Sequence, residues 1–158
     1  MKNGLINPNE LICFTDAYDT LLLRPLKEIE EYYYYINKLT KKKIIISSDD
    51  IKNPLIKTGS KFIFGTCKNL NINSGNYLGK AKDLLIILQE ILNNTNNITD
   101  DQILFTNYCN INPNLFHIDN EKDMFLTIQT TFNDVSKYID IEDNIVYYLQ
   151  YQYIFLNN

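Results

Sequence analysis

Two short apolar runs, each followed by polar and acidic residues, dominate the hydrophobic pattern of the chain. Residues 11–14 lead to Thr15 and Asp16, and residues 44–46 lead to two serines followed by Asp49. Short uninterrupted apolar runs are typical of strands that are buried on both faces, as in sheets covered by helices. We therefore predict two buried strands, and we expect the first to be central in its sheet.

Helical spacing of apolar residues alternates with these runs. One helix is predicted just after Pro25, which a first helical turn tolerates, and its apolar positions are Leu26, Ile29, Tyr33 and Ile36. The clearest amphipathic pattern comprises Ala81, Leu84, Leu85, Leu88, Ile91 and Leu92. Thr99 and Gln102 have the spacing of a capping box, which predicts a third helix that begins near Asp100 with Thr99 as its cap. The alternation of strands and helices predicts an α/β fold.

The remaining segments give weaker predictions. Residues 51–60 contain an Asn-Pro and a Thr-Gly pair and are expected to form a loop. Further strands are predicted over residues 61–64, 115–118 and 124–128, and the apolar tail 145–156 is expected to end the sheet. Neither an internal repeat nor a linker divides the chain, so residues 1–158 are expected to form one domain.

Composition narrows the class of protein. A chain of 158 residues with 45% hydrophobic residues can form a real core, and a net charge of −4 gives no nucleic-acid footprint. No stretch is long and apolar enough to span a bilayer, and the N-terminus does not resemble a secretory signal. Cys13, Cys67 and Cys109 are odd in number and widely spaced, which argues against a disulfide framework. We therefore expect a reducing compartment, with the cytoplasm favoured and Cys13 in the core.

Asp16 and Asp19 are the first candidates for chemistry. If the chain turns where the first strand ends, the two carboxylates can converge at the carboxyl end of an α/β strand and hold a hard divalent cation. The alternative is structural: Asp16 begins an Asx-turn and Asp19 is merely solvated. The spacing alone leaves both interpretations open.

Four motifs in order resemble the glycosyltransferase domain of the procollagen lysyl hydroxylases. Residues 14–19, F-T-D-A-Y-D, are similar to its metal-binding D-x-x-D segment, and residues 72–79, I-N-S-G-N-Y-L-G, to its L-N-S-G-G-F-I-G. Residues 99–106, T-D-D-Q-I-L-F-T, look like its D-D-D-Q-L-F-Y-T, and Ile118-Asp119-Asn120 followed by Phe125 resembles its L-D-H…I-F. Together the motifs bracket roughly residues 11–126.

This resemblance implies a GT-A-type, Rossmann-like mixed sheet flanked by helices. It also implies transfer of a hexose from a UDP-sugar to a hydroxyl acceptor, such as hydroxylysine or a collagen-like glycan, with Mn²⁺ or Mg²⁺ on the pyrophosphate. By position, the metal ligands would be Asp16, Asp19 and Asn120. The donor-binding residues would be Asn73, Ser74 and Gly75, and the acids at the reaction centre would be Asp100 and Asp101.

The chain also departs from the family. The family's third metal ligand is a histidine, where this chain has Asn120, and the only histidine, His117, is expected to be structural or exposed. The family's tryptophan near the donor has no counterpart, and only ten residues precede the first apolar run, where the family has nucleotide-binding strands. We therefore expect a partial domain that binds UDP poorly and whose open edge is covered by a second chain or by self-association. The alternatives are an inactive relative that acts as a binding or assembly module, and an unrelated α/β binding module.

Overall fold

The computed structural model describes residues 6–16, 25–49, 51, 53–95, 98–127, 139–142 and 145–148. The elements, in order, are β1 (Leu11–Thr15), α1 (Leu26–Thr40), β2 (Ile44–Ser48), α2 (Pro54–Phe64), β3 (Ile72–Lys80), α3 (Ala81–Asn93), α4 (Asp101–Ile111), β4 (Phe116–Asp119), β5 (Ile139–Glu142) and β6 (Ile145–Tyr148).

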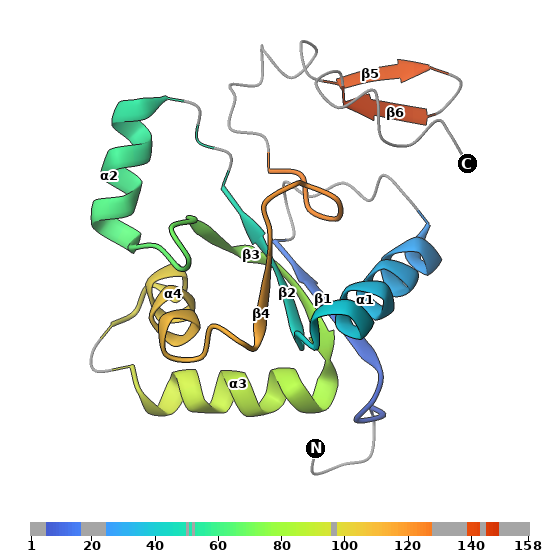
Figure 1. The fold of residues 1–158 in the computed structure, drawn as a ribbon, viewed down its shortest axis with the longest axis horizontal. Coiled ribbons are helices and arrows are strands. Elements are labelled where there is room, and N and C mark those ends of the chain that lie inside the picture. The colour runs from blue at the N-terminus through green and yellow to red at the C-terminus, as the bar shows by residue number, and fades with distance from the viewer. Residues whose placement is uncertain are drawn as a thin grey trace.

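Strands β1 to β4 form one mixed sheet in the order β1-β3-β2-β4 (Figure 1). Strand β3 is antiparallel to both β1 and β2, whereas β2 and β4 are parallel. The carboxyl ends of β1, β2 and β4 and the amino end of β3 therefore meet along one border of the sheet. We call this border the carboxyl edge; it comprises residues 15–16, 47–49, 72–76 and 119–120.

Helices cover both faces of this sheet. This arrangement explains why the apolar run of β2 is uninterrupted. Ile44 and Ile46 pack with α3 and α4 in one cluster, while Ile45 packs with Tyr33 and Ile36 of α1 in another. Successive side chains of a strand point to opposite faces, so a central strand between two helical layers needs apolar residues at every position. The α/β fold with a mixed sheet and flanking helices is confirmed, and it is consistent with a Rossmann-like GT-A fold.

The helix predicted just after Pro25 and the helix predicted from the apolar positions 81–92 are confirmed as α1 and α3. The strands predicted at 44–46 and 115–118 are confirmed as β2 and β4 within a residue or two. The first strand is formed, but its central position is wrong. In the described part of the chain β1 pairs with β3 alone and ends the strand order, and Cys13, Phe14 and Thr15 are exposed. Cys13 is therefore not a core residue.

The loop predicted at 51–60 and the strand predicted at 61–64 are both wrong, because these residues form α2. The side-chain oxygen of Asn53 accepts hydrogen bonds from the backbone N–H groups of Leu55 and Ile56, and Pro54 occupies the first turn. The Asn-Pro pair is therefore a helix start rather than a loop signal. Gly59 lies inside the helix, where it is tolerated at a cost of about 1 kcal/mol.

The segment after β4 also differs from the prediction. Residues 124–127 do not form a strand, because the Asp119 carboxylate turns the chain by accepting the backbone N–H groups of Asp123, Met124 and Phe125. Strands β5 and β6 form a separate two-stranded sheet rather than the end of the main one. Residue 128 and residues 149–158 lie outside the described residues.

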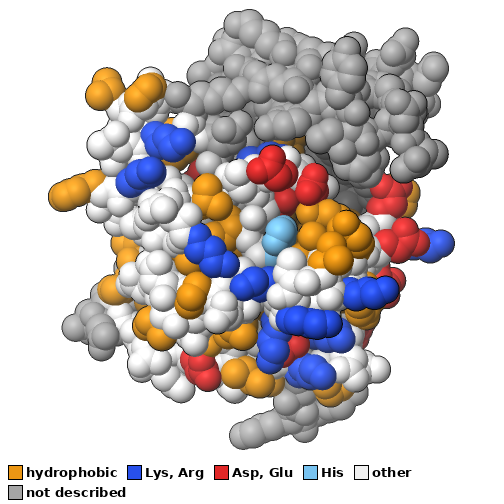
Figure 2. All heavy atoms as spheres, viewed as in Figure 1, with side chains coloured by type: hydrophobic (Ala, Val, Ile, Leu, Met, Phe, Trp, Pro, Cys, Tyr) orange, Lys and Arg blue, Asp and Glu red, His pale blue; other side chains and the backbone are white. Residues whose placement is uncertain are grey.

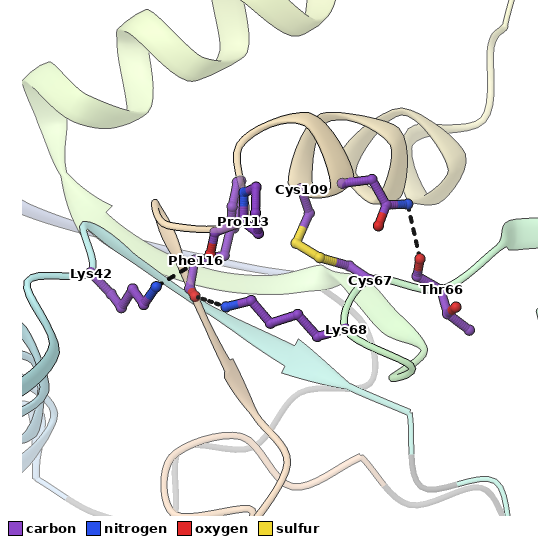
Figure 3. Close-up of a disulfide and its surroundings, with 8 residues drawn as sticks. Lys42, Thr66, Cys67, Lys68, Cys109, Pro113 and Phe116 are labelled. Atoms are coloured by element: carbon purple, nitrogen blue, oxygen red, sulfur yellow. Dashed lines mark hydrogen bonds between the residues drawn. A yellow bond between two sulfur atoms is a disulfide. The ribbon is translucent and has the colours of Figure 1, made fainter.

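A disulfide overturns the expectation drawn from the cysteine count. Cys67 and Cys109, both fully buried, are bonded to each other and join α4 to the segment before β3 (Figure 3). Disulfides persist in oxidising environments, so the cysteines no longer indicate a reducing compartment. Among the described residues, no helix is long and apolar enough to cross a bilayer. Apolar and charged side chains are interspersed over the face of the molecule shown in Figure 2.

Candidate functional site

The carboxyl edge brings Asp16 against Gly75. The Asp16 backbone N–H donates to the Gly75 carbonyl at 2.9 Å, continuing the pairing of β1 with β3. A Cβ atom at Gly75 would overlap with Asp16 Oδ2 and would lie 3.0 Å from Asn73 Oδ1. Only glycine leaves room for this exposed carboxylate to lie on the β3 backbone.

Asn73 links Gly75 to a second acid, Asp49, which follows β2. The Asn73 side-chain oxygen accepts the Gly75 backbone N–H at 2.8 Å, and its side-chain nitrogen donates to Asp49 Oδ1 at 2.8 Å. Gln102 donates to the other oxygen of Asp49 at 3.4 Å. Burial raises the pKa of the Asp49 carboxyl, while these amide hydrogen bonds and the charge of Lys122 act to lower it.

The two acids of α4 lie at the amino end of that helix. Asp100, not Thr99, is the cap, since its Oδ1 accepts the backbone N–H of Ile103 at 3.0 Å. The capping box predicted with Thr99 is therefore wrong by one residue, and Gln102 reaches Asp49 instead of the helix start. Asp101 is exposed in the first turn, and its charge adds to the effect of burial in raising the pKa of Tyr77 on β3. The Phe105 ring of α4 packs on the Tyr77 ring of β3 with centroids 5.0 Å apart, so Asp101 begins a helix that contacts the strand carrying Asn73 and Gly75.

The loop after β4 closes over the end of β2. The Lys122 amine donates to the Ser48 carbonyl and, at 2.8 Å, to the Ser48 hydroxyl, with the backbone of Lys122 in the left-handed region at φ 63°. Asn120 is exposed, and its side chain donates to Glu121 at 3.2 Å. A lysine charge thus adjoins the carboxyl edge next to Asp49.

Of the residues expected in the site, the structure brings Asp16, Asn73 and Gly75 into direct contact and sets the start of α4 beside them. Ser74 is buried. Asn120 follows β4, which lies three strand spacings of about 4.8 Å from β1. Whether its side chain approaches Asp16 therefore depends on the path of the loop after β4. The predicted partner of Asp16, Asp19, lies outside the described residues.

The fit of this edge to a divalent cation can be judged from its donor atoms. Carboxylate and amide oxygens are the hard ligands that Mg²⁺ and Mn²⁺ prefer. Among the described residues, however, no three His, Cys, Asp or Glu side chains cluster in a way that could hold a metal ion. A cation at this edge would therefore rest on Asp16 together with ligands such as Asp19 that the described residues do not include.

Sequence reasoning missed Asp49 and Lys122. The signal for Asp49 was present, because it follows an apolar run just as Asp16 does. Its hydrogen bonds reach residues 24 and 53 positions away in sequence, and no local pattern shows such partners. Lys122 gave no signal, since one lysine in a polar loop is ordinarily solvated. His117, which was expected to be structural or exposed, is half-buried on β4, and burial lowers its pKa.

Comparison with known protein families identifies the family to which the sequence belongs. A search of curated proteins found no significant match. The family model described as the PLOD GT domain matches residues 1–156. That match spans nearly the whole chain and includes all four motifs. The chain therefore belongs to the family of glycosyltransferase domains found in the procollagen lysyl hydroxylases.

Proposed function

We propose that this chain is a glycosyltransferase domain that transfers a hexose from a UDP-sugar to a hydroxyl acceptor with the help of a divalent cation. The observation that carries the proposal is the Asp16 carboxylate lying on Gly75 at the carboxyl edge, in a chain that matches the family over residues 1–156. In open α/β sheets ligands bind in the crevice at the carboxyl ends of the strands. This edge is therefore the place for a nucleotide-sugar.

The proposed roles follow from the exposure of each side chain and from the hydrogen bonds that its oxygen atoms already accept. Asp16, with Asp19 and Asn120, would hold Mn²⁺ or Mg²⁺, and a bound cation would neutralise charge on a diphosphate leaving group. Gly75 has no side chain, so the Asp16 carboxylate can lie on the β3 backbone, and a cation or sugar held by Asp16 would lie beside β3. Asp101 is exposed, whereas one oxygen of Asp100 is engaged in the helix cap. Asp101 is therefore better suited than Asp100 to meet the acceptor hydroxyl.

A calorimetric titration of UDP with and without Mn²⁺ tests this proposal. We expect binding that requires Mn²⁺, an affinity at least tenfold weaker in Asp16→Asn, and transfer activity that falls more than UDP affinity in Asp101→Asn. Asp83→Asn is the matched control, because Asp83 pairs with Lys43 at the opposite end of the sheet. Mn²⁺-independent UDP binding, or equal losses in Asp16→Asn and Asp83→Asn, would contradict the metal role of Asp16.

A second candidate is an inactive relative that binds or assembles. Two observations favour it: Asp100 is engaged in the helix cap, and the Asn120 amide donates to Glu121. A folded chain that binds neither UDP nor UDP-sugar in the presence of Mn²⁺ would support this second function over transfer.

A further inference from the structure

A line of hydrogen bonds crosses the carboxyl edge from β1 to α4, and Asp49 lies in the middle of it. Asp16 is bonded to the Gly75 carbonyl, the Gly75 N–H donates to Asn73, and Asn73 donates to Asp49. Gln102 on α4 donates to the second oxygen of Asp49. The Asp49 carboxylate joins β3 to α4, and the backbone bond between Asp16 and Gly75 extends the line to β1.

The chemistry of a carboxylate fixes the direction of each bond in this line. An ionised Asp49 can only accept hydrogen bonds, so Asn73 must turn its NH₂ group toward Asp49. Its amide oxygen then faces the Gly75 N–H, as the 2.8 Å contact shows. Without the carboxylate, only the Gly75 N–H would hold the Asn73 side chain, and that side chain could turn away toward water. The contact between Asn73 and Gly75 would then be weakened.

We propose that Asp49 is a positioning residue of this site, which orients the Asn73 amide toward Gly75 and, through Gln102, holds the start of α4 beside β3. This inference rests on the proposed transferase function. Asp49 itself is half-buried and is given no contact with donor or acceptor. Its effect on the reaction passes through Gly75, on which Asp16 lies, and through the helix start that carries Asp100 and Asp101.

The electrostatics of Asp49 agree with this role. Burial disfavours a carboxylate unless hydrogen-bond donors or positive charge compensate for the lost water. Asn73 and Gln102 supply the donors, and the charge of Lys122 acts in the same direction. The groups that Asp49 orients thus offset part of the cost of burying this acid.

Exchanging the two partners gives a sharp test. Asp49→Ala removes the acceptor, and Asn73→Asp brings two carboxylates face to face. The double variant Asp49→Asn with Asn73→Asp keeps the net charge and nearly the same volume. In it, Asn at position 49 can donate to Asp at position 73, and that Asp can still accept the Gly75 N–H.

Hydrogen exchange of the Gly75 amide, followed by NMR, reads the positioning directly and requires no ligand. We expect exchange up to about tenfold faster in Asp49→Ala, the upper range for loss of the neutral hydrogen bond from the Gly75 N–H to Asn73. UDP affinity measured with Mn²⁺ should fall by a similar factor in Asp49→Ala and in Asn73→Asp. The exchanged pair should restore both quantities to within about threefold of the parent chain. Asp83→Ala is the control that lowers stability at the far end of the sheet and leaves Gly75 exchange unchanged.

The outcomes separate the two proposals. Unchanged Gly75 exchange in Asp49→Ala, or an exchanged pair no better than Asn73→Asp alone, would overturn the positioning role. A parent chain that does not bind UDP with Mn²⁺ would overturn the transferase proposal, and Gly75 exchange would still decide whether Asp49 orients Asn73.

Discussion

Strands β1 and β2 begin from the same kind of sequence and end in different environments. Each is a short apolar run followed by hydroxyl residues and an aspartate, Asp16 after β1 and Asp49 after β2. All five residues of β2 are buried, whereas the last three of β1 are exposed. The difference lies in the strand order, because β2 pairs with β3 and β4 between two helical layers while β1 ends the described sheet.

The two aspartates that follow these strands differ in exposure in the same way. Asp16 is exposed and lies on the bare backbone of Gly75, a place where a carboxylate can meet a ligand. Asp49 is half-buried and both its oxygens accept amide hydrogen bonds, a place where a carboxylate can hold other residues in position. One sequence signature therefore supports two roles, and the position of the strand in the sheet decides between them.

The largest expected effect tests the difference in burial. Ile46→Ala on β2 should lower the free energy of unfolding by about 2–5 kcal/mol, since Ile46 is fully buried in the core cluster. Phe14→Ala on β1 should cost about 1 kcal/mol, because Phe14 is 42% exposed and chiefly loses its stacking on Tyr77, with ring centroids 4.8 Å apart. Urea denaturation of both variants measures the two values. Equal losses would mean that β1 is as deeply packed as β2.

A smaller effect is expected from closing the space in which Asp16 lies. Gly75→Ala introduces a Cβ that overlaps with the Asp16 carboxylate, so the side chain must move. The exposed Asp16 side chain can move aside, so we expect a stability loss of at most about 1 kcal/mol, together with loss of any Mn²⁺-dependent UDP binding. Gly59→Ala on α2 is the matched control, because a Cβ there meets nothing within 4 Å and should stabilise the helix by about 1 kcal/mol. Retained Mn²⁺-dependent binding in Gly75→Ala would remove Asp16 from the ligand set.

The same comparison shows how far the sequence could lead. Local patterns were sufficient for β2, α1 and α3, because apolar periodicity records which faces a segment buries. They could not place β1, since strand order depends on pairing with β3, more than 60 residues later. The Cys67–Cys109 disulfide was missed for the same reason, as its cysteines are 42 residues apart. For α2, the local signal itself was ambiguous, because Asn53-Pro54 can begin either a loop or a helix.

The residues of the candidate site likewise fall into two groups: those that a local motif predicts, and those whose role depends on partners far away in the sequence. Residues that belong to a recognisable motif, such as Asp16, Asn73 and Gly75, were found through the resemblance and do lie together. The Thr99 cap was misplaced because Asp100 offers an equally good acceptor one position later, and only the helix start decides between them. Asp49 acquires its role from Asn73 and Gln102, which become its neighbours only when the chain folds.

The smallest expected effect is a dependence of stability on pH that reports the burial of Asp49. Burial raises the pKa of this carboxyl above its ordinary value of 3.8, so the folded protein binds the proton more tightly than the unfolded chain does. Stability from this group is therefore complete below pH 3.8 and is lost as the pH rises through the raised pKa. Relative to Asp49→Asn, the parent chain should lose stability over that interval, by no more than about 1.4 kcal/mol per pH unit. Denaturation of both proteins at a series of pH values measures this difference.

In an Asn73→Ala background the interval should extend to higher pH, because a hydrogen bond that lowers the pKa of Asp49 is gone. A parent chain that instead gains stability over Asp49→Asn with rising pH would show that the amides and Lys122 outweigh burial. The hydrogen bonds and the Lys122 charge would then stabilise the ionised form of Asp49 by more than burial destabilises it.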